Sequence, residues 1–393
     1  MKVIFYQPVS FLRSAKKTNP FFDPVIDVCR KNGIDWEIWL PDARVEHGYE
    51  KSHVRDMRWF YFWDHLFYRI FHYVFRVNAG RAQVWAGFLL RQLTFHRFKA
   101  DLVVSIAGCL VHVMKSFFPH TRAADIQHGV VYSSHKGYFD PQGRIWSFYW
   151  SYPEREFWLY GPGYANCFFK NPENHRWLDG RVKVVGDVVR HEVAETCEGA
   201  RNLIVISGQF KPESDLACML DQVRGIREFL KAFIAKYGTR YQVLIRHHPR
   251  FRGVAELEAL HREFPQFQET KEPWSALYGR MYLHVTFSST VVFDAASNGV
   301  PSYLLMPTNP RDPVLENAFW RDDYACPFFG MSLDEMMSAA DNPHVRADTR
   351  AWYERFYAPF DEERCLRLIW GEAWAHLSRS ARICYTMHQE LTS

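Results

Sequence analysis

Residues 282–301 read YLHVTFSSTVVFDAASNGVP, and this stretch decides the fold class of the chain. Its first six residues are apolar and rich in β-formers, so they predict a buried strand. Three hydroxyl residues follow, and residues 291–296 show a helix pattern that ends at Asn298–Gly299, with Pro301 just beyond. A strand that runs directly into a helix is the building unit of parallel α/β sheets.

The three hydroxyl residues, Ser288, Ser289 and Thr290, stand where this helix is predicted to begin. The first turn of a helix leaves backbone N–H groups unpaired and carries partial positive charge. Hydroxyl groups at that point either cap the helix or help to bind an anion such as phosphate. Both interpretations stay open on this motif alone.

Polar residues also follow two other predicted strands of the second half of the chain. Residues 243–250 read VLIRHHPR, a strand that ends in Arg246, His248 and Pro249. Gln209 follows the first strand of this half, at residues 203–207. An Arg/His cluster is often only a solvated surface. Because the carboxyl ends of parallel strands meet at one edge of a sheet, however, the shared location favours a ligand site, with these residues binding a donor phosphate.

A comparable motif lies in the first half, where residues 123–126 predict a strand that leads into Gln127–His128–Gly129. Glycine permits a sharp turn, and the imidazole projects from the strand end. A histidine there is either structural or a proton acceptor near neutral pH. His135 and Lys136 follow a few residues later, either as substrate-binding groups or in a solvated loop.

Strand and helix patterns alternate along both halves, which predicts parallel sheets with helices on both faces. Predicted strands cover residues 3–6, 36–40, 102–106, 123–126, 157–160, 182–185, 203–207, 243–246, 282–287 and 303–306, and predicted helices cover 20–32, 214–237 and 254–264. The charged run at 190–201 resembles a linker, so we expect an N-terminal domain at 1–190 and a C-terminal domain at 200–393. The tail at 333–391 is expected to be mostly helical.

Composition excludes several function classes. The chain has 393 residues, 48% of them hydrophobic, and a net charge of +4, far below the basic excess of a nucleic-acid binder. Its eight cysteines form no CxxC pair, no DxD-like pair follows a strand, and no GxGxxG motif follows the first strand of either half. We therefore expect free thiols, no metal and no dinucleotide cofactor. The absence of a signal-peptide pattern or a spanning stretch predicts a cytoplasmic protein.

The three motifs, taken in order, resemble the glycosyltransferases of bacterial capsule and surface-polysaccharide synthesis. In those GT-B enzymes, Rossmann-like domains face a central cleft and a helical C-terminal tail crosses back to the first domain. An "HP" pair, here His248–Pro249, and a serine/threonine pair, here Ser288–Ser289, hold the donor nucleotide, while an "HG" element, here His128–Gly129, faces the acceptor. The bacterial sialyltransferases carry an acidic "D/E-D/E-G" motif where this chain has Gln127–His128–Gly129.

This resemblance implies a glycosyltransferase that moves a CMP-activated acidic sugar, such as Kdo or a sialic acid, to a glycan or glycolipid. His128 is then the candidate base, or only orients substrate if anomeric configuration is retained. Gln127, Gly129, His135 and Lys136 are candidates for the acceptor side. The related CDP-glycerol glycerophosphotransferases leave a polyol-phosphate transferase as an alternative, and a non-catalytic glycan-binding or scaffold protein is a third.

A segment dense in aromatic and basic residues, at about residues 52–98, interrupts the first half and is predicted to form a helical insertion. One interpretation is a surface that meets the inner face of the cytoplasmic membrane, since Trp and Tyr favour the bilayer boundary and Arg favours anionic head groups. The other is a buried helical hairpin whose arginines extend outward to water. The sequence does not separate them, because aromatic residues occur on nearly all faces.

Overall fold

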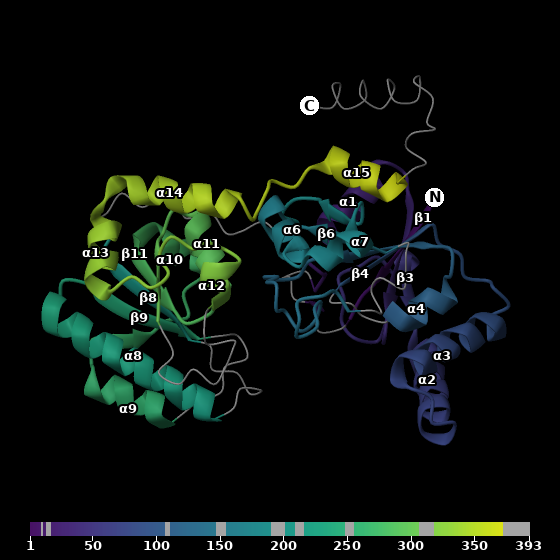
Figure 1. Cartoon of the computed structure of the whole chain (residues 1–393), viewed down its shortest axis with the longest axis horizontal. Helices are drawn as coiled ribbons and strands as arrows, with labels where there is room; N and C mark the ends of the chain where they lie inside the picture. Colours follow the sequence, from purple (N-terminus) through teal and green to yellow (C-terminus); the bar gives the residue numbers. More distant parts are fainter. Residues whose placement is uncertain are drawn as a thin grey trace. The chain divides into compact units, whose positions relative to one another are not determined.

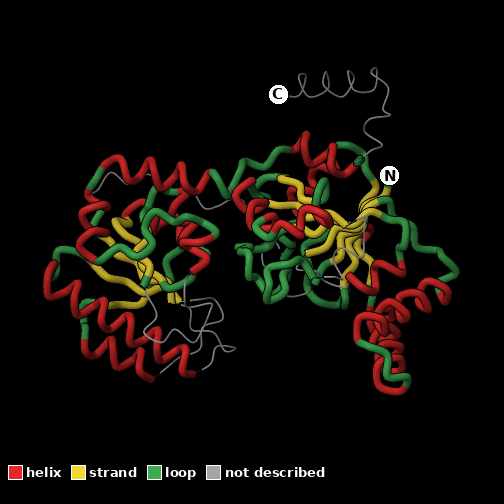
Figure 2. The backbone as a smooth tube through the Cα atoms, viewed as in Figure 1, coloured by secondary structure: helices red, strands yellow, loops and turns green. Residues whose placement is uncertain are grey.

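The computed structural model describes residues 1–8, 11–12, 17–106, 111–146, 155–189, 201–208, 216–247, 255–305 and 318–371. Its chain divides into two compact units. Unit 1 comprises residues 1–161, 168–189 and 358–393, and unit 2 comprises residues 162–167 and 190–357. In each unit the strands gather into one sheet with helices around it (Figure 2).

The sheet of unit 1 has seven parallel strands in the order β3-β2-β1-β4-β5-β6-β7. The strands are β1 Lys2–Tyr6, β2 Asp35–Leu40, β3 Val54–Asp56, β4 Leu102–Ile106, β5 Arg122–Ile126, β6 Arg155–Leu159 and β7 Val182–Val184. The chain runs outward through β2 and β3 and then returns to place β4 on the other side of β1. The strand order therefore reverses between β1 and β4.

Helices cover both faces of this sheet, because alternate residues of its central strands are buried on opposite sides. On one face Ile4 and Tyr6 of β1 pack with α2, α3 and α4, and on the other Phe5 contacts Phe22 just before α1. Helix α15 lies against α1, and Lys31 Nζ lies 2.7 Å from Glu362 Oε1 in an ion pair between them. The helices are α1 Asp23–Lys31, α2 Arg58–Arg69, the π-helical turn η3 Ile70–Val74, α3 Ala79–Leu93, α4 Val111–Phe117 and α15 Glu362–Trp370.

The sheet of unit 2 has five parallel strands in the order β10-β9-β8-β11-β12. They are β8 Leu203–Gly208, β9 Gln242–His247, β10 Phe267–Glu269, β11 Met281–Thr286 and β12 Ser302–Leu304. In this sheet the order reverses between β8 and β11. The helices packed around it are α8 Leu216–Tyr237, α9 Ala255–Glu263, α10 Trp274–Arg280, α11 Val291–Ser297, α12 Ala318–Asp322, α13 Leu333–Asp341 and α14 Pro343–Glu354.

An aromatic cluster holds the C-terminal part of unit 2 together. Phe293 of α11 is its centre and stacks on Trp352 of α14 with ring centroids 5.0 Å apart. Tyr164, from α6 (Pro162–Phe169), joins the cluster and hydrogen-bonds Tyr357 through their hydroxyls at 2.9 Å. Figure 1 shows the chain continuing from α14 to α15 (both yellow), which packs in unit 1. The units are thus discontinuous, whereas the sequence predicted the contiguous ranges 1–190 and 200–393.

Most predicted strands match the structure within one or two residues, and two differences concern short edge strands. β3 and β10 each have three residues and are absent from the predicted set. The predicted helical insertion at about 52–98 therefore begins with an edge strand, and its helices occupy residues 58–93. The remaining short elements are η2 Lys51–His53, η4 Pro172–Asn174 and α7 His175–Leu178. The described helices include none that is long and apolar enough to cross a bilayer.

Candidate functional site

The carboxyl ends of β8, β9 and β11 lie side by side in unit 2. Ser207 of β8 pairs with Thr286 of β11 on one side and with Arg246 of β9 on the other. This is the point at which the strand order reverses, and open α/β sheets bind ligands in the crevice outside such a point. The structure therefore brings together two of the predicted donor-side segments, those at Arg246 and at residues 288–290.

The three hydroxyl residues after β11 differ in what they bind. Ser289 is buried, and its Oγ accepts a hydrogen bond from the Val291 N–H at 3.3 Å, which makes it a cap for α11. Ser288 is half-buried and Thr290 is exposed, and neither hydroxyl has a hydrogen-bond partner within the described part of the chain. Ser288 and Thr290 are therefore the two hydroxyls available to a ligand.

A fourth hydroxyl, which the sequence reasoning did not single out, fixes this turn. Thr286 is fully buried at the end of β11. Its Oγ1 donates to the Ser207 carbonyl at 3.4 Å and accepts from the Ser289 N–H at 3.3 Å. Thr286 thus ties the end of β8 to the start of α11, so the loop carrying Ser288 and Thr290 has a defined position.

Arg246 lies on the face of the sheet that packs against α10. Its guanidinium lies over the Trp274 ring, 5.2 Å from the centroid, and donates to the Glu272 backbone carbonyl. These contacts hold the half-buried cation at the end of β9. Gln209, His248 and Pro249, the other donor-side predictions, lie outside the described residues.

His284 is a buried histidine beneath this edge that the sequence reasoning missed. It is fully buried on β11, and its two ring nitrogens lie 2.8 Å from Ser207 Oγ on β8 and 2.9 Å from Ser302 Oγ on β12. Burial lowers the pKa of His284 to about 3, so the ring stays neutral at physiological pH. It therefore acts as a polar cross-brace between three adjacent strands, two of which, β8 and β11, end at the candidate site.

In unit 1, Gln127 is fully buried where β5 ends, and its side-chain amide binds only backbone. Its Nε2 donates to the Gly129 carbonyl at 2.6 Å, and its Oε1 accepts from the Tyr160 N–H at 3.0 Å. Gln127 thus positions the turn and presents no side-chain group to an acceptor. Gly129 has no positive φ, and a Cβ at that position would meet nothing within 4 Å. The turn does not require glycine, contrary to the sequence argument.

His128 is half-buried on this turn, and its ring packs edge-on against Phe11 with centroids 5.5 Å apart. His135 lies in the loop that follows this turn. Burial, and secondarily repulsion by the His128 ring, lower the pKa of His135 to about 4. The Gly137 N–H donates to His135 Nδ1 at 3.1 Å, so the neutral ring offers an N–H at Nε2 rather than a positive charge.

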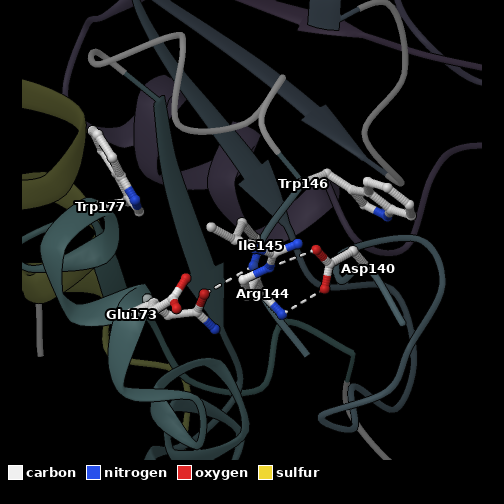
Figure 3. A pocket seen from close by; sticks show the side chains of 7 residues that line it. Asp140, Arg144, Ile145, Trp146, Glu173 and Trp177 are labelled. Carbon is white, nitrogen blue, oxygen red and sulfur yellow. Dashed lines mark hydrogen bonds and ion pairs between the residues drawn. The ribbon is translucent and has the colours of Figure 1, made fainter. Parts of the chain in front are cut away.

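A pocket of 370 Å³ lies beside this loop in unit 1 (Figure 3). Asn174 lines the pocket and holds the surrounding segments together. Its side chain binds the Ile145 N–H and the carbonyls of Gly143 and Phe168. Arg144 crosses the centre with its Nε 2.8 Å from Asp140 Oδ2. The residues that line the pocket are Asp140, Arg144, Ile145, Trp146, Glu173, Asn174 and Trp177.

Two indole rings on opposite sides give this pocket its character (Figure 3). The Trp146 ring N–H donates to the Lys136 carbonyl at 2.9 Å, which links the pocket to the predicted acceptor-side loop. The exposed Glu173 carboxylate makes no hydrogen bond or ion pair within the described residues. Flat aromatic faces with nearby carboxylates suit a sugar ring, whose C–H face packs on an indole while its hydroxyls donate to oxygen.

Beneath the same edge of unit 1, Arg155 and Asp125 form a buried ion pair. Their side chains are 2% and 0% exposed, and Arg155 Nη2 lies 2.8 Å from Asp125 Oδ2. Asp125 precedes the Gln127 turn by two residues on β5 and Arg155 begins β6. Breaking such a pair leaves an uncompensated charge, so it is a structural anchor for the turn rather than a reacting group.

No protein-family model and no curated protein matches the sequence. Solved structures match its fold. The UDP co-structure of S. aureus MnaA aligns at a TM-score of 0.53 and 11% identity over 96% of this chain and 97% of that one. The apo form of the lipopolysaccharide outer core galactosyltransferase WaaB aligns at 0.51 and 11% identity over 94% and 99%.

The glycotransferase of kitacinnamycin also aligns, at a TM-score of 0.51 and 11% identity over 94% of this chain and 98% of that one. At these identities the similarity is one of fold. Together with the two parallel sheets it confirms the predicted α/β class with two Rossmann-like halves of the GT-B type.

Proposed function

We propose that the protein is a nucleotide-sugar-dependent glycosyltransferase whose donor binds at the end of β8 and β11. The observation that carries this proposal is the position of the Ser288 and Thr290 hydroxyls, at the start of α11 and at the reversal point of the sheet. Departure of a nucleotide leaves negative charge on its phosphate, and fixed hydrogen-bond donors stabilise that charge. Arg246, two strands away, adds a cation on the same edge.

The acceptor side is proposed to lie in unit 1. As the acceptor oxygen attacks the anomeric carbon, the bond from that carbon to the phosphate breaks, and the acceptor hydroxyl must lose its proton. His128 is the proposed proton acceptor. The pocket of Trp146 and Trp177 is the proposed seat for a sugar of the glycan or glycolipid. His135 contributes a neutral N–H donor, and Lys136, exposed in the same loop, contributes a charge.

The proposed donor is a CMP-linked acidic sugar of the Kdo or sialic-acid type. Its support is the resemblance carried by the residues 127–129 and 288–290. The MnaA co-structure contains UDP, so the critical comparison is between a cytidine nucleotide and a uridine nucleotide. The proposal assigns neutralisation of the leaving phosphate to hydroxyls, Arg246 and the helix start, without a metal ion.

A thermal-shift screen with CMP, CDP, UDP and GDP tests this proposal. A nucleotide that binds only the folded protein raises the melting temperature by mass action. We expect CMP to give the largest shift. A larger shift with UDP would overturn the cytidine assignment, and a preference for CDP together with turnover of CDP-glycerol would favour polyol-phosphate transfer. The absence of a shift with all four nucleotides would contradict the proposed enzymatic function and favour a non-catalytic glycan-binding protein.

A further inference from the structure

The exposed apolar side chains of this protein are concentrated in one helical hairpin of unit 1. In the described part of the chain, eleven large hydrophobic residues are exposed, and ten of them lie between Phe62 and Phe95. The eleventh is Leu216, at the start of α8 in unit 2. Single exposed hydrophobic residues are ordinary, but a gathering of ten marks an interaction surface.

The hairpin is well anchored on one side only. Figure 1 shows α2 and α3 projecting from the sheet of unit 1, with α4 at their base. The buried side of α3 consists of small residues and Leu90, and it packs so closely on α4 that a Cβ at Gly87 would lie 2.4 Å from the Val113 carbonyl oxygen. The other sides of these helices carry exposed residues, namely Phe62, Trp63 and Leu66 of α2 and Trp85, Phe88 and Leu93 of α3. The segment is therefore no buried hairpin.

The turn between the two helices carries three consecutive side chains that are well exposed. Tyr73, Val74 and Phe75 are 68%, 70% and 64% exposed. Phe71 joins them to α3, because its ring lies 6.1 Å from that of Phe75 and 5.4 Å from that of Trp85. These five residues form a continuous apolar tip, which we call the hairpin tip.

Positive charge surrounds the hairpin tip. Residues 58–99 contain seven Arg and Lys residues and one Asp, so this segment is more positive than the whole chain, whose net charge is +4. Arg69, Arg76 and Arg81 are exposed at the two sides of the turn. Aromatic side chains interspersed with arginines complement an anionic bilayer, where the rings enter the interface and the cations meet the lipid phosphates.

An apolar hollow of 480 Å³ opens at the other end of the hairpin. Trp59 and Trp63 of α2 line one side, Leu93 and Phe95 the other, and the exposed Arg97 lies at its rim. This combination suits one lipid, with an acyl chain in the hollow and the phosphate at Arg97. A soluble protein partner would require neither a hollow of the size of an acyl chain nor a cation at the rim of that hollow.

We propose that the helical hairpin at residues 58–99 is a docking surface for an anionic lipid bilayer, with the hairpin tip inserted into the interface. This proposal does not rest on the proposed enzymatic function. It brings unit 1, which carries the candidate acceptor pocket, to a membrane surface.

Co-sedimentation with lipid vesicles tests the proposal, in the absence of any nucleotide. The full chain is mixed with vesicles of phosphatidylcholine alone or of equal parts phosphatidylcholine and phosphatidylglycerol. We expect binding to the anionic vesicles that weakens as salt is added, and at least about tenfold weaker binding to the neutral ones. The variant Val74→Ser/Phe75→Ser should bind the anionic vesicles about tenfold or more weakly, because the two apolar side chains that enter the interface are removed.

Two matched controls accompany these measurements. Leu216→Ser removes an exposed hydrophobic residue from unit 2 and should leave binding unchanged. Arg76→Gln/Arg81→Gln should weaken binding and its salt dependence, whereas Arg262→Gln/Lys271→Gln, two exposed cations of unit 2, should not. Circular dichroism establishes that each variant is folded, and light scattering gives its oligomeric state.

Failure of the wild-type protein to bind anionic vesicles would overturn the proposal. So would equal losses for Leu216→Ser and for the tip variant. A wild-type dimer that Val74→Ser/Phe75→Ser converts to a monomer, without vesicle binding, would assign the surface to a second copy of the chain instead.

Discussion

At the scale of single residues, neighbouring polar side chains in this protein take different roles according to burial. Ser289 caps a helix, whereas Ser288 and Thr290 on either side of it keep hydroxyls available. The sequence predicted the location of all three from the strand-to-helix pattern. It did not separate their roles, because the turn is fixed by the hydrogen bonds of Thr286 to the Ser207 carbonyl of a neighbouring strand and to the Ser289 N–H.

His284 shows why the sequence reasoning missed a buried polar brace. In the sequence it is one polar residue in an apolar run, and its two serine partners lie 77 and 18 residues away. Gln127 is the converse case, because the sequence predicted a substrate-binding role for it. In the structure its side-chain amide instead binds backbone groups. Both outcomes depend on contacts between strands that no local pattern contains.

The buried state of His284 predicts a pH-dependent contribution to stability. Its pKa is about 3 in the folded protein and about 6.5 when unfolded, so the unfolded state binds the proton first as pH falls. The folded protein should therefore lose stability through this group as pH falls from about 6.5 towards 3, by up to about 1.4 kcal/mol per pH unit.

Urea unfolding of wild type and His284→Gln between about pH 7 and pH 5 checks this prediction. The wild type should be the more stable at neutral pH because its ring satisfies both serines, and its advantage should shrink as pH falls. Parallel stability curves would show that His284 does not titrate in this way.

At the same scale, the role proposed for His128 predicts a loss of turnover with little change in donor affinity. His128→Ala should lower turnover at saturating substrates by roughly 100-fold or more, because general-base catalysis typically contributes 10²–10⁴-fold. His135→Ala, in the same loop, serves as the comparison and should mainly raise the Michaelis constant for the acceptor. Near-normal turnover in His128→Ala would remove it as the base.

At the scale of elements, α15 illustrates how a C-terminal helix is held in unit 1. Its apolar side, with Cys365, Leu366 and Ile369, is buried, and α1 lies against it. The Arg122 guanidinium of β5 donates to the carbonyls of Leu368 and Ile369 at 2.8 and 3.0 Å, which satisfies the last turn. The sequence predicted a helical tail from its amphipathic pattern, and the resemblance implied the return to the first domain.

Removing that guanidinium should loosen α15. In Arg122→Ala the last turn loses a charged donor to two carbonyls, so amide hydrogen exchange in Glu362–Trp370 should accelerate by about tenfold or more. Arg367→Ala, on the exposed side of the same helix with only a 3.7 Å ion pair to Glu363, is the matched control and should change exchange little. Equal acceleration in both variants would contradict a capping role for Arg122.

Two short edge strands, β3 and β10, are the strands that the sequence did not predict, whereas the equally short edge strands β7 and β12 correspond to the predicted ranges 182–185 and 303–306. β3 and β10 have three residues each and no apolar run, so neither shows a period long enough to recognise. Central strands such as β1 and β11 were predicted because burial on both faces gives them runs of mostly apolar residues. For the aromatic hairpin, the sequence did not decide whether its side chains are buried in a core or exposed on a surface. The exposed fractions of those side chains decide this.

At the scale of the whole molecule, the chain combines two Rossmann-like units with an added hairpin. Four cysteines, Cys29, Cys167, Cys326 and Cys365, are buried and form no disulfide within the described part of the chain, in keeping with the thiols expected from their spacing. The alternating strand and helix pattern predicted the two sheets. The resemblance implied the return of the C-terminal tail, which the structure describes to residue 371, to unit 1. The placement of residues 162–167 in unit 2 was not predicted, because it rests on aromatic contacts across long sequence separations.

The central claim is that a nucleotide binds at the end of β8 and β11 through Ser288 and Thr290. Calorimetric titration of CMP into wild type, Ser288→Ala/Thr290→Val and Ser297→Ala tests it most directly, the last being a serine at the far end of α11 whose Oγ donates to the Asp294 carbonyl. Each lost hydrogen bond to a charged phosphate is worth about 1.5–3 kcal/mol, so we expect the double variant to bind CMP about 100-fold or more weakly and Ser297→Ala to bind it with unchanged affinity. Equal affinity of CMP for all three proteins, or no binding to wild type, would contradict it.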